Sequence, residues 1–337
     1  MLRELALPAA GVLVTAACFA TLAATDGGLH GPFAALAGHG AWMLAPLAFA
    51  LLLTTAPVQS ALQRRLSPRT AAILTPMACA GYLAALAGAA APAPQPAGEV
   101  FLRTLLLAGL PMALFAMRRP PQNETSPAID ALDVAAGTAI MAVAGLKVLG
   151  LRLHLGSRSA GLLEMDAAFF AWLAVLAVYV VLVRRLPLGF SLRVERRDLA
   201  VAVATYGALM AVLLPLAFAI GMVAEAPSSK PASEVLFFVT YYLFRIAFGE
   251  ELFFRLVLQS ALIRWASARC GERRGAWLGL AIASVVFGLC HYRFGGGFAV
   301  LAALAGLGYG WAYLATGRLT APVLVHGLVD ITNALLH

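Results

Sequence analysis

The chain has 337 residues, of which 62% are hydrophobic and only 12% are charged, and its mean hydropathy is +0.87. This composition is far more apolar than that of a soluble domain, so a soluble globular protein is excluded. The sequence therefore predicts an all-α fold, a polytopic transmembrane helical bundle with about 10 to 11 spans.

Apolar runs of about the length that crosses a bilayer recur along the whole chain. The first run follows a single basic residue, Arg3, and exceeds the core of a signal peptide, so we interpret it as a retained anchor. In chain order, the expected spans are Leu5–Ala24, Gly40–Ala56, Ala71–Ala91, Phe101–Met117, Ala131–Gly150, Ala167–Val183, Leu199–Val223, Val235–Leu262, Ala276–His291, Phe298–Ala315 and Ala321–Leu336.

Basic residues support this count, because most of them fall on the same alternate side of successive spans. They are Arg64, Arg65, Arg69, Arg118, Arg119, those from Arg184 to Arg197, those from Arg264 to Arg274, and Arg318. That side should be cytoplasmic, with the N-terminus inside. One connection disagrees, since Lys147, Arg152 and Arg158 fall on the outer side. Either the span Ala131–Gly150 is re-entrant, which leaves an even total, or the rule is locally broken.

The net charge of +8 belongs mostly to these flanking loops, where basic residues set orientation and meet anionic lipid. We therefore expect the lipid bilayer as a partner and no nucleic acid. The alanine-rich, arginine-over-lysine composition favours a bacterial protein of the inner membrane. The four cysteines have no CxxC spacing, so no disulfide or thiol chemistry is indicated.

A polar loop near Pro227–Pro231 precedes the segment Val235–Leu262, which should form one long apolar helix. We place a functional boundary there. Residues 1–230 would form an N-terminal transmembrane bundle of unknown role, and residues 231–337 would carry the chemistry.

Three charges lie on this expected helix. Glu250, Glu251 and Arg255 occupy a segment that should lie at membrane depth, where an ionisable side chain costs at least about 2.5 kcal/mol and indicates a functional site. Residues four apart share a helical face, so Glu251 and Arg255 can form an ion pair. Glu250 is turned about 100° away and lacks that partner. One carboxylate should thus be neutralised and the other left free.

Two further spans carry imidazole groups. His291 ends one of them, and His326 and Asp330 lie four apart on one face of the last. Three separate helices therefore each contribute a carboxylate or an imidazole. Two such i,i+4 pairs can also be structural locks in a bundle, and a membrane histidine commonly bonds a neighbouring carbonyl group.

These residues form three ordered motifs. Glu250 to Arg255 fits EExxxR, Phe287 to His291 fits FxxxH, and His326 to Asp330 fits HxxxN/D. In this order the motifs make the C-terminal third of the chain similar to the CPBP (Abi, CaaX-protease and bacteriocin-processing) family of intramembrane proteases. The resemblance implies hydrolysis of a peptide bond in a membrane-associated peptide or protein, for example a C-terminal processing or sorting segment. Residues 231–337 would form the protease domain.

The resemblance also implies roles for the motif residues. Glu250 and His291 would activate a water molecule, and His326 with Asp330 would polarise the scissile carbonyl group and stabilise the oxyanion. Glu251, held by Arg255, would be a structural support. The three catalytic side chains Glu250, His291 and His326 should then converge, with functional atoms about 3–8 Å apart.

Two features leave alternatives open. Many relatives have asparagine where this chain has Asp330, and an ionised aspartate cannot donate a hydrogen bond to an oxyanion. Asp330 is therefore either protonated, or it orients His326 and stabilises its charged form. Glu250, His291 and His326 could instead form a His2Glu zinc site, but no HExxH spacing is present and we expect no metal and no other cofactor.

A different class of function is a non-catalytic membrane transporter, or an immunity-type binding protein on the same scaffold. Transporters commonly show repeats in both halves, whereas the polar residues here lie almost wholly in the last third. Every motif position except the asparagine is filled, which argues against an inactive site.

Overall fold

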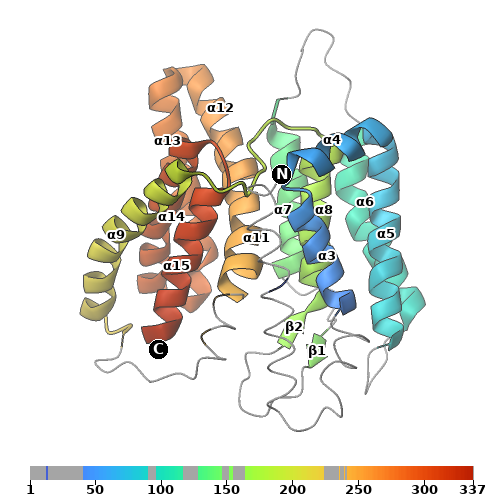
Figure 1. Cartoon of the computed structure of the whole chain (residues 1–337), viewed down its shortest axis with the longest axis horizontal. Coiled ribbons are helices and arrows are strands. Elements are labelled where there is room, and N and C mark those ends of the chain that lie inside the picture. Colours follow the sequence, from blue (N-terminus) through green and yellow to red (C-terminus); the bar gives the residue numbers. More distant parts are fainter. Residues whose placement is uncertain are drawn as a thin grey trace. The chain divides into compact units, whose positions relative to one another are not determined.

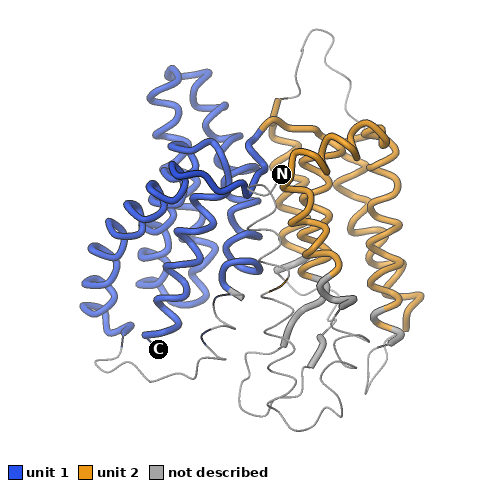
Figure 2. The backbone as a smooth tube through the Cα atoms, in the orientation of Figure 1, with its two compact units in different colours: residues 1–7, 188–337 blue, residues 8–187 orange. Residues whose placement is uncertain are grey.

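The computed structural model describes residues 13, 41–89, 96–116, 128–145, 152–154, 164–223, 235, 239 and 241–336. This part of the chain is helical except for one short antiparallel strand pair, so the expected all-α class is confirmed. It divides into two compact units, one within residues 8–187 and one within residues 188–337 (Figure 2). The first expected span, Leu5–Ala24, lies outside the described residues except for Leu13.

Where the structure describes it, the unit within residues 8–187 consists of α-helices, a π-helical turn and the strand pair, and α8 contacts α3, α5 and α7 (Figure 1). Its elements are α3 (Ala41–Leu52), α4 (Ala56–Arg65), α5 (Pro68–Ala89), α6 (Ala97–Ala116), α7 (Ala131–Gly145), β1 (Arg152–His154), β2 (Glu164–Asp166), α8 (Ala167–Val178) and η2 (Tyr179–Val183). The expected span Gly40–Ala56 ends early, because the chain turns by 95° between α3 and α4. The hydroxyl groups of Thr54 and Thr55 donate to the carbonyl groups of Leu51 and Leu52 at this bend.

The unit within residues 188–337 contains the three motifs. Its elements are α9 (Arg196–Ala219), η3 (Tyr241–Ala247), α11 (Phe248–Glu251), η4 (Leu252–Gln259), α12 (Ser260–Cys270), α13 (Glu272–Cys290), η5 (Tyr292–Phe294), α14 (Gly296–Thr316) and α15 (Thr320–Leu336). Helices α12 and α13 form a tight hairpin, in which a Cβ atom at Gly279 would lie 2.6 Å from the backbone nitrogen of Ile263. Small residues of this kind let membrane helices approach closely.

Helix α9 packs with the motif helices, although it precedes the boundary expected at residue 231. It contacts both α14 and α15. The compact unit therefore begins near Leu188. Compactness does not say which helices the chemistry requires, so the functional boundary at residue 231 stays a prediction.

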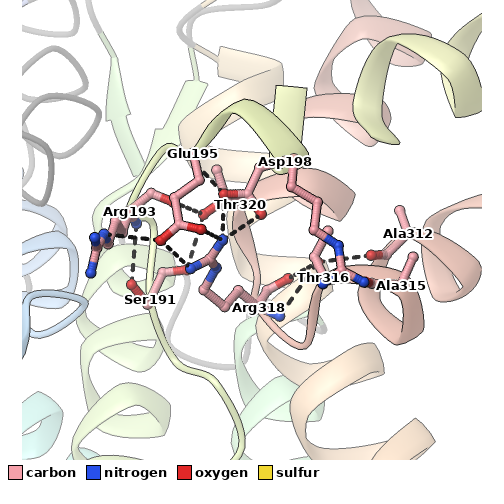
Figure 3. A network of polar contacts seen from close by, with 10 residues as sticks. Ser191, Arg193, Glu195, Asp198, Ala312, Ala315, Thr316, Arg318 and Thr320 are labelled. Carbon is pink, nitrogen blue, oxygen red and sulfur yellow. Dashed lines mark hydrogen bonds and ion pairs between the residues drawn. The ribbon is translucent and has the colours of Figure 1, made fainter. Parts of the chain in front are cut away.

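A polar network ties the start of α9 to the loop between α14 and α15 (Figure 3). Arg318 Nη2 donates to Glu195 Oε2 at 2.8 Å and to Asp198 Oδ2 at 2.9 Å, and the same two carboxylates form a capping box at the N-terminus of α9. Thr320 Oγ1 donates to the Arg193 carbonyl oxygen at 2.7 Å. These contacts fix the first residue of α15, six positions before His326.

Among the described residues, four helices are long and apolar enough to cross a membrane: α6, α9, α13 and α14. The bent pair α3 and α4 would make a fifth span, and three apolar helices are shorter: residues 131–143, 169–183 and 320–336. The chain is thus an integral membrane protein. The count of 10 to 11 spans stays a prediction, since α5, with 22 residues, is not among the helices that qualify, and the other expected spans are shorter, broken or outside the described residues.

Candidate active site

The two adjacent glutamates lie on a short α-helical turn between two π-helical segments. Four residues, Phe248–Glu251, form α11, and η3 and η4 flank it. The sequence predicted one long apolar helix over Val235–Leu262, and the described residues 241–262 are helical throughout, with π-helical turns that were not predicted. Hydrophobic periodicity reports which face is apolar, but it does not report how the backbone hydrogen bonds are spaced. π-Helical turns are rare and frequently occur at functional sites.

Glu250 lies between two imidazole rings that come from different helices. Its Oε2 atom is 3.7 Å from His291 Nε2 and 3.9 Å from His326 Nε2. Among the described residues, no donor forms a hydrogen bond with this buried oxygen. The expected convergence of the three side chains is therefore present. Since both nitrogens lie just beyond hydrogen-bond distance, a single small polar molecule could contact the carboxylate and either ring.

The three side chains lie at different distances from the ends of their helices, and the fold accommodates this difference. Glu250 and His291 are about 30 Å from the tip of the α12–α13 hairpin at 1.5 Å per residue, whereas His326 is only about 9 Å from the start of α15. Figure 1 shows how the difference is accommodated, because the hairpin extends past the start of α15.

Glu251 is held on both carboxylate oxygens. Arg255 Nε donates to its Oε2 at 2.7 Å, and His326 Nδ1 lies 2.8 Å from its Oε1. Glu251 and Arg255 are fully buried, and His326 is 2% exposed. The expected pair of Glu251 with Arg255 is confirmed. The contact with His326 was not predicted, because helical periodicity describes one helix and cannot say which residues of two helices meet.

His326 is oriented at both ring nitrogens and on both faces. A carboxylate only accepts hydrogen bonds, so Nδ1 carries hydrogen and donates to Glu251. Nε2 is 3.3 Å from Asp330 Oδ2, which confirms that this i,i+4 pair forms. The ring stacks on Tyr309 with centroids 4.4 Å apart, and Phe287 meets it edge-on. No motif or spacing in the sequence pointed to Tyr309.

His291 follows the last residue of α13 and has a defined orientation as well. Its Nδ1 lies 2.8 Å from the carbonyl oxygen of Phe287, four residues before it. The carbonyl group can only accept, so Nδ1 is the donor and Nε2 is left facing Glu250. This contact accounts for the FxxxH spacing. The carbonyl group of Phe287 fixes the imidazole ring of His291, and the phenyl ring of Phe287 packs against His291 and His326.

The donor types at this site, one carboxylate and two imidazoles, are those that zinc takes in hydrolytic sites. Within the part of the chain that the structure describes, no group of three such side chains is arranged to hold a metal ion. Glu251 also occupies His326 Nδ1, so only Nε2 of that ring could serve as a ligand. The expected independence of metal stays a prediction.

One segment of the chain matches a protein-family model, and it contains all six predicted site residues: Glu250, Glu251, Arg255, His291, His326 and Asp330. Residues 232–332 match the family Rce1-like, described as type II CAAX prenyl endopeptidase. The match confirms the resemblance of this segment to CAAX-type proteases and supports endopeptidase activity in general. The comparisons with curated proteins and with solved structures give no match.

Proposed function

Because residues 232–332 match this endopeptidase family, we propose that the chain is an intramembrane endopeptidase that cleaves a membrane-associated peptide or protein. One observation carries the proposal. Glu250 presents a buried oxygen without a hydrogen-bond donor to two oriented imidazoles, while its neighbour Glu251 is fully engaged. Buried polar groups are usually hydrogen-bonded, so this acceptor favours a site that receives a small polar molecule.

In the proposed reaction, Glu250 takes a proton from a water molecule that it shares with His291. The resulting hydroxide attacks the carbonyl carbon of the scissile peptide bond. Glu250 then returns the proton to the nitrogen of the leaving group as the C–N bond breaks. The Glu250 carboxylate suits this work, because its Oε2 atom has no hydrogen-bond donor among the described residues and can accept the proton.

His326 would stabilise the negative charge that develops on the carbonyl oxygen. Glu251 at Nδ1 and Asp330 at Nε2 both favour the charged ring. A charged imidazole carries hydrogen on both nitrogens, so Nε2–H can donate to the oxyanion. We infer that Glu251 is sufficient to hold this charge, and that Asp330 mainly orients the ring where many relatives have asparagine.

Asp330→Asn tests that role. We expect it to keep activity within about tenfold of wild type, because a neutral amide can still contact His326 on the Nε2 side and Glu251 still holds Nδ1. Initial rates of peptide cleavage in detergent micelles measure this. Asp330→Ala, which removes the acceptor, should lose more. A fall of about 10³-fold or more in Asp330→Asn would instead mean that the aspartate charge is required.

Chelation tests the metal-free form of the mechanism. If Glu250 and His291 activate water without zinc, activity should survive exhaustive treatment with a chelator, and the purified protein should contain well under one equivalent of metal. Cleavage rates and elemental analysis on the same sample measure both quantities. Loss of activity on metal removal, with recovery on adding zinc back, would favour the His2Glu site.

For the substrate we propose only a class, a membrane-associated peptide or protein. The family description names prenylated CAAX substrates, and a bacterial enzyme could equally process a peptide, a bacteriocin or a C-terminal sorting tail. We propose a location in the bacterial inner membrane with the N-terminus in the cytoplasm. Peptides released from membranes that contain wild-type protein, compared with membranes that contain Glu250→Gln, would identify the substrate. Identical peptide sets from both membranes would contradict the protease assignment.

A further inference from the structure

One buried side chain outside the three motifs connects the site to α14. Gln259 is fully buried at the end of η4, four residues after Arg255 and eight after Glu251. Its Oε1 atom accepts a hydrogen bond from Arg255 Nη1 at 3.1 Å. Its Nε2 atom donates to the backbone carbonyl oxygen of Gly310 at 3.1 Å. Both ends of the amide group are therefore engaged.

The backbone of α14 is shaped to receive this amide. A Cβ atom at Gly310 would lie 2.5 Å from Gln259 Oε1, 3.1 Å from Arg255 Nη1 and 2.2 Å from Leu280 Cδ1. Real Cβ atoms do not approach other atoms so closely, so a side chain at position 310 would displace the ends of the Leu280 and Gln259 side chains. Gly310 also follows Tyr309, the residue that stacks on His326.

Arg255 depends on Gln259 for its position. Its guanidinium group makes two side-chain hydrogen bonds, to Glu251 and to Gln259, and its Nη2 atom has no hydrogen-bond partner among the described residues. Apart from these bonds, it is flanked by the rings of Phe287 and Tyr309, at 5.5 and 6.0 Å. Removing the acceptor on Gln259 would leave a buried guanidinium free to turn away from Glu251.

We propose that Gln259 is a positioning residue for the site. Through Arg255 it holds the Glu251 carboxylate, and Glu251 in turn fixes His326 so that Nε2 faces Glu250 and Asp330. The chain of hydrogen bonds runs from the α14 backbone across η4 and α11 to α15. Its effect on catalysis rests on the proposed function, whereas its effect on His326 does not.

Gln259→Leu tests the proposal, because it removes both hydrogen bonds and keeps a similar volume. We expect kcat to fall about 10- to 100-fold, since a small displacement of a catalytic group has an effect of this size, and KM to change less than about twofold. Gln63→Leu is the matched control. Gln63 Nε2 also donates to a backbone carbonyl oxygen, that of Val181 at 2.8 Å, but far from the motifs in sequence. This control should keep the wild-type kcat.

A second readout does not require activity. In protein labelled with ¹⁵N-histidine, His326 Nδ1 should give a hydrogen-bonded N–H signal that exchanges slowly with solvent, assigned by its loss in His326→Gln. In Gln259→Leu this signal should weaken or exchange faster, and in Gln63→Leu it should not. If Gln259→Leu does not fold, Gln259→Met serves for the same measurement.

The outcomes separate this proposal from the proposed function. A changed His326 signal together with a lower kcat supports it. If the wild-type protein has no proteolytic activity, the proposed function is overturned. A changed His326 signal in Gln259→Leu would then still support the positioning role of Gln259. An unchanged His326 signal in folded Gln259→Leu overturns it, whatever happens to kcat.

Discussion

Glu250→Gln should reduce proteolysis by about 10²–10⁴-fold, the usual contribution of a general base. The glutamine has nearly the shape of the glutamate, and Glu250 has no cation on its own helix that the change would leave unpaired. The variant should therefore fold with nearly wild-type yield. Rates with purified protein in detergent measure the first effect, and size-exclusion profiles with thermal unfolding measure the second.

Glu272→Gln is the matched control for this change. Glu272 is exposed at the start of α13, at the end of that helix opposite His291, so its neutralisation should leave the cleavage rate unchanged. If Glu250→Gln cleaves substrate as fast as wild type, this carboxylate is not the base.

Arg255→Ala should lower the free energy of unfolding by about 3–5 kcal/mol, because it removes the guanidinium group that pairs with the fully buried Glu251 carboxylate and leaves only His326 in contact with that charge. A buried charge without a partner is far more costly than the loss of an attractive pair at the surface. Unfolding by heat or denaturant in detergent micelles measures the change.

An exposed pair of the same spacing is the control. Arg103 and Glu99 form an i,i+4 ion pair in α6 with side chains 58% and 50% exposed. Arg103→Ala should cost less than about 1 kcal/mol, as surface pairs usually do. Equal stability losses in the two variants would mean that burial of Glu251 does not decide the role of Arg255.

Contacts within one helix were the most predictable part of the site. The pairs Glu251 with Arg255 and His326 with Asp330 follow from four-residue spacing alone, and both are present. The order of the motifs predicted that Glu250 lies close to His291 and His326, because side chains that act on the same substrate must lie near one another. Composition was sufficient for the helical class, since a bilayer leaves the backbone few other ways to satisfy its hydrogen bonds.

Contacts between helices were not predictable from one sequence. The bond from His326 to Glu251 depends on the relative rotation and depth of α11 and α15, which no periodicity encodes. The same holds for the stacking of Tyr309 on His326 and for the bond of Gln259 to Gly310. Gln259 did carry a weak signal, because it continues the four-residue spacing of Glu251 and Arg255.

Details of helix geometry were not predictable from hydropathy. The π-helical segments η3 and η4 lie within an apolar run that stays helical but changes the spacing of its backbone hydrogen bonds. At the end of α3, the hydroxyl groups of two threonines share carbonyl acceptors with backbone N–H groups at the 95° turn to α4. Hydropathy responds to neither feature, so it missed the π-helical turns and overestimated the length of the span Gly40–Ala56.

Cleavage in ¹⁸O-labelled water tests the central claim most directly, namely that Glu250 activates water to hydrolyse a peptide bond. Membranes with wild-type protein would be incubated in labelled water, and the released peptides would be analysed by mass spectrometry without added protease. We predict products whose new carboxyl group carries one ¹⁸O atom in wild type, and none above background in Glu250→Gln. Labelled products at equal levels in both samples, or in neither, would contradict the account.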